Sequence, residues 1–134
     1  MLEIAANRYK QVQATMSSPG QILMALYDGL FRFLRGARLC IERREVTRAR
    51  ELLSRAHAVL FELEMALDHR VAPELCANLH ALYDFSLDRV QVARISAKVE
   101  PIDEIIRVLT PLHEAFAIAV AETTKRPATG TTGR

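Results

Sequence analysis

Three side chains that can bind a metal ion lie four residues apart, namely Cys76, His80 and Asp84. Zinc and iron sites in proteins use these thiolate, imidazole and carboxylate groups as ligands. In a helix, however, residues eight apart point about 80° away from each other, so Cys76 and Asp84 diverge. The chain also lacks the Glu-x-x-His, Cys-x-x-Cys and His-Glu-x-x-His patterns of familiar metal sites. We therefore expect no metal site and no cofactor, only a partly buried Cys76 and a His80–Asp84 pair.

The pattern of nucleophiles does not indicate catalysis either. His57 and His113 fall near apolar stripes, where a hydrogen-bonded structural histidine is the expected role. The sequence contains no Gly-rich phosphate-binding loop, and none of the serines lies in a Gly-x-Ser-x-Gly elbow. The serines in question are Ser17, Ser18, Ser54, Ser86 and Ser96. We expect that the protein is not an enzyme.

The elements that carry these residues are predicted from apolar periodicity. The chain has 134 residues, of which half are apolar and 6% are aromatic, a length suited to one domain. Apolar residues recur at steps of three and four in four segments, approximately residues 19–42, 47–68, 73–97 and 101–122. The connections are short, so consecutive helices must run antiparallel. The sequence therefore predicts an all-α fold, an antiparallel up-down-up-down four-helix bundle over residues 17–122.

The two ends of the chain lack this periodicity. Residues 1–16 contain only scattered apolar positions, which predicts a flexible N-terminal arm. Residues 123–134 are rich in Thr, Gly and Pro, which predicts a disordered C-terminal tail. Within the last helix, Pro111 removes one backbone hydrogen bond and predicts a bend.

The sequence also indicates where the protein works. Its longest apolar run, from Ala115 to Ala121, is far shorter than the roughly 20 residues of a membrane-spanning helix. The first ten residues lack the apolar centre of a signal peptide, and the two cysteines do not form a disulfide framework. We expect a cytoplasmic protein with no membrane insertion.

Positive charge is concentrated in the first helical hairpin. Eight arginines and three glutamates lie between Arg32 and Arg55, although the net charge of the chain is only +2. A solvated helix face is the simplest interpretation, and an acidic protein surface or a nucleic acid are alternative partners. Because no recognisable nucleic-acid motif accompanies the arginines, we expect no nucleic-acid partner.

The first helix has a clear start and an unusual stripe of small residues. Ser18 is suited to cap the first turn, and Pro19 is suited to the first helical position because it lacks an N–H group. Ile22, Ala25 and Gly29 then share one face, which continues at Gly36. Each glycine costs roughly 1 kcal/mol relative to alanine in a helix, which the close approach of another helix would offset. That helix belongs either to the bundle itself or to a partner.

One short sequence occurs twice. Leu23-x-Ala25-Leu26-Tyr27-Asp28 in the first helix reappears 56 residues later as Leu79-x-Ala81-Leu82-Tyr83-Asp84 in the third. The first and third helices of such a bundle run parallel, so the two Tyr-Asp pairs are expected at similar heights. A coincidence of common residues is the alternative.

These residues resemble a known family. Tyr9 to Ala14, then Ser18-Pro19-Gly20, Leu26-Tyr27-Asp28-Gly29 and the second Leu-Tyr-Asp are similar to the flagellin export chaperones of bacteria, the FliS family. The resemblance covers nearly all of the chain except the tail. It implies an antiparallel helical bundle that holds the C-terminal segment of flagellin in the cytoplasm, prevents premature polymerisation and delivers the subunit to the flagellar export apparatus.

The resemblance and the small-residue stripe together predict a partner-binding surface. Its members are Tyr9, Val12, Ile22, Leu23, Ala25, Leu26, Tyr27, Asp28, Gly29, Leu82, Tyr83 and Asp84. We expect the arm to fold over this surface when flagellin is absent, because Tyr9 and Val12 otherwise have no core to join. A homodimer is possible, and the alternative function is a structural bundle that only homodimerises through the small-residue stripe.

Overall fold

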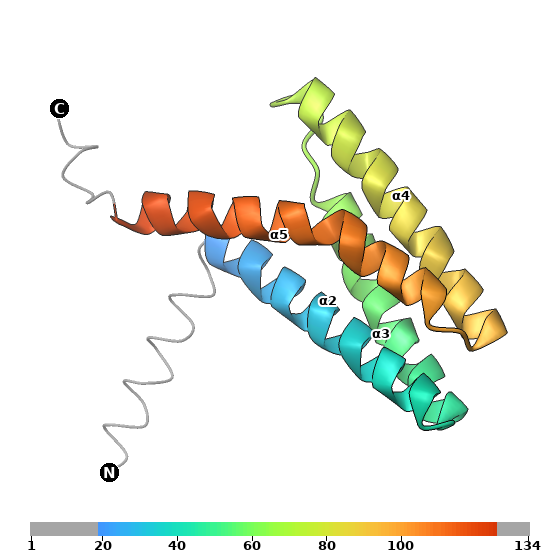
Figure 1. Cartoon of the computed structure of the whole chain (residues 1–134). Helices are drawn as coiled ribbons and strands as arrows, with labels where there is room; N and C mark the ends of the chain where they lie inside the picture. The colour runs from blue at the N-terminus through green and yellow to red at the C-terminus, as the bar shows by residue number, and fades with distance from the viewer. Residues whose placement is uncertain (1–18, 126–134) are drawn as a thin grey trace, which may run out of the picture.

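The structure is a computed structural model that describes residues 19–125, and every regular element in that range is an α-helix. The helices are α2 (Pro19–Glu42), α3 (Val46–Met65), α4 (Pro73–Ser96) and α5 (Glu100–Lys125). Each packs against its neighbours in the order α2, α3, α4, α5, and α5 returns to α2 (Figure 1). The prediction of an all-α four-helix bundle is confirmed. Ser18, the N-terminal arm and residues 126–134 lie outside the described residues.

Local hydrogen bonds set the helix ends. α2 has the predicted bounds, whereas α3 ends at Met65, three residues before the expected Asp68. The Asp68 carboxylate accepts a hydrogen bond from the backbone N–H of Arg70 at 3.1 Å, a turn that competes with helix continuation. α4 ends where Ala97 adopts a left-handed conformation (φ 56°). α5 continues through Lys125, so residues 123–125 are helical rather than part of a disordered tail.

The core consists of the apolar stripes that all four helices turn inward. Its largest fully buried side chains include two tyrosines and a phenylalanine among aliphatic residues. They are Tyr27, Tyr83, Phe31, Leu30, Leu34, Leu53, Leu60, Leu63, Ile102, Ile105, Leu109 and Val90. Burial of a leucine-sized side chain contributes roughly 1.5–3 kcal/mol, so this core is the main source of stability.

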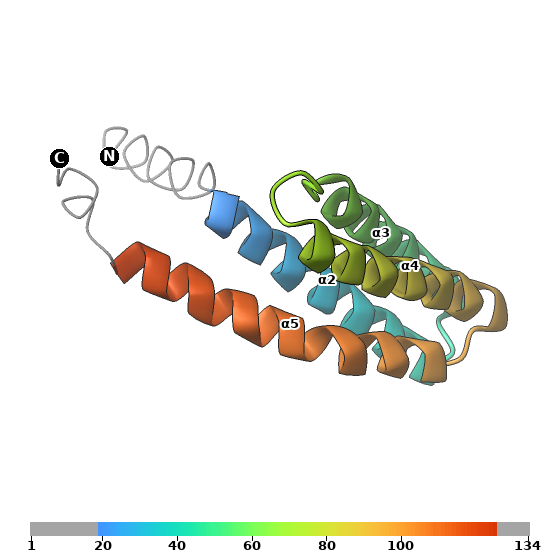
Figure 2. The ribbon, with the colours of Figure 1, turned by 90° about the horizontal axis from the view of Figure 1, so that it is seen from above.

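The bundle is open at one end. α2 begins and α5 ends beyond the α3–α4 hairpin, a feature visible in two perpendicular views (Figures 1 and 2). α5 also changes direction about midway along its length in Figure 1, and Pro111 lies inside this helix. A proline there leaves one carbonyl without its helical donor, which accounts for the predicted bend. Beyond the bend, the far part of α5 lies beside the start of α2 (Figure 2).

None of the helices between residues 19 and 125 combines the length and the apolar character that crossing a membrane requires.

Candidate functional site

The repeated Leu-Tyr-Asp sequences meet in the centre of the bundle. The hydroxyl groups of Tyr27 and Tyr83 lie 2.7 Å apart in a buried hydrogen bond between diagonally opposite helices. The two Tyr-Asp pairs therefore lie at similar heights, as predicted. Burial is the main reason why the pKa values of both tyrosines are raised above 10. Both tyrosine side chains are core residues of the bundle in this structure.

The side chain of Asp28 links α2 to α5. Its carboxylate lies 3.0 Å from Nε2 of His113 on α5. The His113 ring stacks on Phe31, with ring centroids 4.9 Å apart, and on Tyr27 at 5.6 Å. His113 is therefore a hydrogen-bonded structural histidine, as the sequence predicted. Its partner, Asp28, was not predicted.

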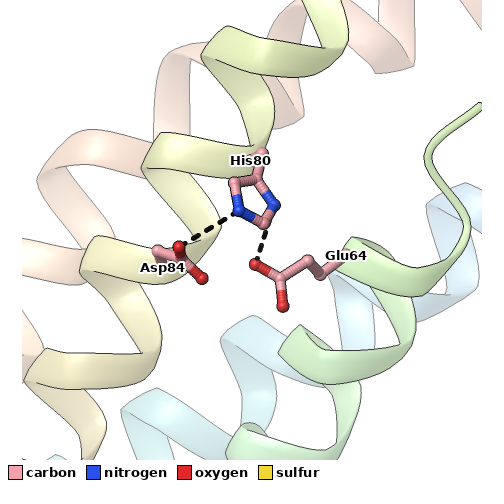
Figure 3. Close-up of side chains that lie close together, drawn as sticks. All are labelled: Glu64, His80 and Asp84. Carbon is pink, nitrogen blue, oxygen red and sulfur yellow. Dashed lines mark ion pairs between the residues drawn. The ribbon is translucent and has the colours of Figure 1, made fainter. Parts of the chain in front are cut away.

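Asp84 belongs to a different cluster, between α3 and α4. Nδ1 of His80 lies 3.1 Å from the Glu64 carboxylate, and Nε2 lies 3.2 Å from that of Asp84 (Figure 3). The pKa of Glu64 is raised, first by a hydrogen bond with the Asp84 carboxyl and then by burial. Cys76 does not take part, because its thiol donates to the carbonyl oxygen of Asp68 at 3.3 Å. Sequence spacing could not identify Glu64, which lies on another helix.

The small residues of α2 have unequal roles. A Cβ added to Gly36 would lie 3.2 Å from Cδ1 of Leu52 on α3, so Gly36 permits close packing inside the bundle. A Cβ added to Gly29 would approach only the end of Arg32, at 3.9 Å. Internal packing thus accounts for Gly36, whereas no neighbouring helix in the described residues requires glycine at position 29.

An apolar concavity lies at the open end, between the start of α2 and the end of α5. This α2–α5 pocket has a volume of about 370 Å³. It is lined by Pro19, Gly20, Leu23, Phe116, Ala119, Val120 and Thr123. The same two helix segments carry the exposed side chains of Ile22 and Ile118, with 42% and 62% of their surface accessible. The open end thus combines a pocket with unburied apolar surface.

The predicted partner-binding residues are distributed over several environments. Of the members within residues 19–125, Leu23 alone lines the α2–α5 pocket, and Ile22, the preceding residue, is exposed. Ala25, Leu26 and Leu82 are half-buried, Gly29 is buried, and Asp28 and Asp84 are exposed. Tyr9 and Val12 lie outside the described residues.

The residues on the α5 side of the pocket were not predicted from the sequence, although the sequence pattern and the topology indicate them. In an up-down-up-down bundle the start of the first helix must lie near the end of the last. Phe116 and Val120 belong to the apolar arc of the last helix, so pairing the two ends would have identified them.

Comparison with known proteins gives a consistent result. The family described as "Flagellar protein FliS" matches residues 1–123. The chain is 34% identical over 113 residues to the flagellar secretion chaperone FliS of Salmonella typhimurium, with 81% of this chain and 84% of that protein covered. It is 29% identical over 113 residues to FliS of Campylobacter jejuni, with 84% and 88% covered.

A solved structure supports the fold. A bacterial flagellar chaperone seen by crystallography superimposes with a TM-score of 0.72 at 23% identity, and the match covers 91% of this chain and 99% of that one. At this identity the likeness bears on the fold alone, whereas the family match spans nearly the whole sequence. The chain belongs to the FliS family of flagellar secretion chaperones, which are not enzymes.

Proposed function

We propose that this protein binds the C-terminal segment of flagellin in the cytoplasm, prevents its premature polymerisation and delivers it to the flagellar export apparatus. Membership of the FliS family supports the general role. The single observation that carries flagellin binding is the α2–α5 pocket, an apolar cavity at the open end of the bundle.

The chemistry of the pocket fits an apolar anchor. Six of its seven lining residues carry no side-chain polar group, and Thr123 is the exception. An amphipathic helix docks by placing side chains from one face into such a cavity. A volume of about 370 Å³ suits a few side chains rather than a whole helix. The rest of the contact would extend over exposed apolar surface such as Ile22 and Ile118.

Binding through one small pocket also predicts a large surrounding contact. A flagellin end that is unfolded outside the filament must lose conformational entropy when it binds, which only extensive contact can offset. Exposed apolar side chains elsewhere on the bundle are suited to this. They include Phe61 and Met65 on α3, with accessible fractions of 51% and 68%, and Leu75 and Phe85 on α4.

Two exposed alanines of α5 provide a matched test. Ala119 lines the α2–α5 pocket, whereas Ala121 does not. We expect Ala119→Trp to fill the pocket and weaken the binding of a flagellin C-terminal peptide at least about tenfold, equivalent to roughly 1.4 kcal/mol. Ala121→Trp should bind nearly as the native protein does. Isothermal titration calorimetry measures both, and circular dichroism checks that each variant remains helical.

The result also separates flagellin binding from a purely structural role. Equal affinity of the two variants for the peptide would show that the peptide binds outside the α2–α5 pocket. Sedimentation with and without the peptide tests the remaining alternative: a homodimer that ignores the peptide would overturn the proposed function.

A further inference from the structure

Glu64 near the end of α3 and His80 and Asp84 on α4 form a cluster that flagellin binding does not explain. Each side chain offers one ligand atom, and these atoms all lie within 4.8 Å of one another (Figure 3). We propose that the Glu64–His80–Asp84 cluster binds a Zn²⁺ ion that links α3 to α4. This replaces the expectation of no metal site, for which only ligands on a single helix had been considered.

The ligand types and their placement suit zinc. His80 and Asp84 are one helical turn apart and therefore project from the same face of α4, while Glu64 reaches them from α3. Imidazole and carboxylate groups are usual zinc ligands, with bonds of about 2.0–2.2 Å. A tetrahedral ion holds its ligand atoms roughly 3.3–3.6 Å apart by those bond lengths. Ligand atoms at the 4.8 Å limit thus have to approach one another by roughly 1.2–1.5 Å.

The side chains have room for this contraction. About half of the surface of His80 and of Asp84 is accessible, at 48% and 57%. The imidazole now presents one nitrogen toward each carboxylate, so the exposed ring must turn until a single nitrogen faces an ion held by both. The exposed side of the cluster leaves water to complete the coordination, an arrangement common in open zinc sites.

The charges within the Glu64–His80–Asp84 cluster give an independent reason to expect a bound cation. Within residues 19–125, the ion pairs of Glu64 and Asp84 are with His80 alone, and no arginine or lysine pairs with either carboxylate. The Oε2 atom of Glu64 is buried and accepts no hydrogen bond of acceptable geometry in this range. His80 Nδ1 lies 3.1 Å from this oxygen as an ion-pair partner, but outside hydrogen-bonding geometry. A buried carboxylate oxygen without a well-aligned hydrogen bond is costly, and a divalent cation beside it would balance the two negative charges. Mg²⁺ is a poorer candidate, because it favours oxygen ligands and keeps its water.

The test uses the full-length, untagged protein after treatment with a chelator, because a polyhistidine tag binds zinc itself. Titration with ZnCl₂ should reveal one saturable site by calorimetry and an increase in the melting temperature, since an ion bound to the folded state stabilises it. The same concentration of MgCl₂ should leave the melting temperature unchanged.

Matched substitutions locate the site. Glu64→Gln, His80→Ala and Asp84→Asn should each weaken Zn²⁺ binding at least about tenfold, as loss of even a supporting residue does elsewhere. Glu62→Gln and Asp88→Asn remove exposed carboxylates from the same two helices outside the cluster and should bind Zn²⁺ as the native protein does. Circular dichroism confirms that every variant folds.

Substitution of Co²⁺ for Zn²⁺ identifies the ligand atoms. The Co²⁺ complex should show visible d–d absorption without the thiolate charge-transfer band that Cys40 or Cys76 would produce. That band would place the metal on a cysteine and overturn the proposal. So would the absence of saturable Zn²⁺ binding, or native affinity in His80→Ala. None of these outcomes depends on whether flagellin binds.

Discussion

At the scale of single residues, the buried contact between Tyr27 and Tyr83 makes each hydroxyl dependent on the other. Their oxygens lie 2.7 Å apart, and at most 1% of either residue is accessible to solvent. Water cannot replace a lost partner at such a site, so the remaining hydroxyl would be buried without a hydrogen bond. The two copies of Leu-Tyr-Asp are thus coupled through the core.

A double-mutant cycle tests this coupling. Tyr27→Phe and Tyr83→Phe should each lower the free energy of unfolding by about 1–3 kcal/mol, because each leaves one hydroxyl unpaired. The double variant should lose clearly less than the sum, since no unpaired hydroxyl remains. Urea denaturation followed by circular dichroism provides the three values. Strictly additive losses would show that the hydrogen bond contributes little.

Two of the three glycines of α2, Gly29 and Gly36, should respond differently to the same substitution. Gly29→Ala gains helix propensity and meets only the end of Arg32 at 3.9 Å, so it should stabilise the protein by up to about 1 kcal/mol. Gly36→Ala gains the same propensity but places its Cβ 3.2 Å from Cδ1 of Leu52, which must shift. We expect little or no net gain at position 36. Thermal unfolding of both variants measures the difference, and equal stabilisation would contradict the packing role of Gly36.

At the scale of the helices, Arg38 joins α2 to α5 at the end opposite the α2–α5 pocket. Its Nε lies 2.7 Å from Oδ1 of Asp103, and Nη2 lies 3.3 Å from Oδ2. Asp103 is in the first turn of α5, where a negative charge is also favoured by the helix dipole. The hydrogen bond from Arg38 is the main reason why the pKa of Asp103 is lowered from 3.8.

This contact predicts a specific sensitivity to acid. Because the folded-state pKa of Asp103 is lowered, the charged carboxylate stabilises the folded state above pH 3.8, and this contribution disappears as the pH falls through the folded-state value. Asp103→Asn should therefore have a lower melting temperature than the native protein at neutral pH, and the difference should shrink as the pH falls below 3.8.

Melting temperatures measured over the acidic range test this prediction. Glu122→Gln removes an exposed carboxylate from the other end of α5 and provides the control. A gap between Asp103→Asn and the native protein that persists unchanged at low pH would contradict the assigned role of the carboxylate.

The helices themselves were largely predictable from sequence. Apolar residues that recur every three to four positions over a long segment lie on one face only if the segment is an α-helix. The bounds of α2 and the similar heights of the two Tyr-Asp pairs followed from that period and from topology. The end of α3 did not, since it depends on a side-chain turn at Asp68. The His80–Asp84 pair was predicted from its spacing, but the position of Glu64 beside it could not be foreseen, because Glu64 lies on another helix whose rotation about its axis is fixed only by packing.

At the scale of the whole molecule, the two ends of the bundle differ. The Arg38–Asp103 contact links α2 to α5 at the end where α2 leads into α3 and α4 leads into α5. At the other end α2 and α5 extend past the α3–α4 hairpin (Figure 2). Residues of these two helices line the α2–α5 pocket. This end carries the exposed side chains of Ile22 and Ile118, and it is also where residues 1–18 join α2.

That connection leads to a prediction about the N-terminal arm. Pro19 lines the α2–α5 pocket and is attached directly to residues 1–18, so Tyr9 and Val12 are within chain reach of the cavity. If the arm occupies the flagellin surface in the free protein, a bound flagellin peptide must displace it. Hydrogen exchange of residues 1–16 should then become faster when the peptide binds, and a variant lacking these residues should bind the peptide more tightly. Equal protection of the arm in both states, with unchanged affinity after its removal, would exclude competition between the arm and flagellin.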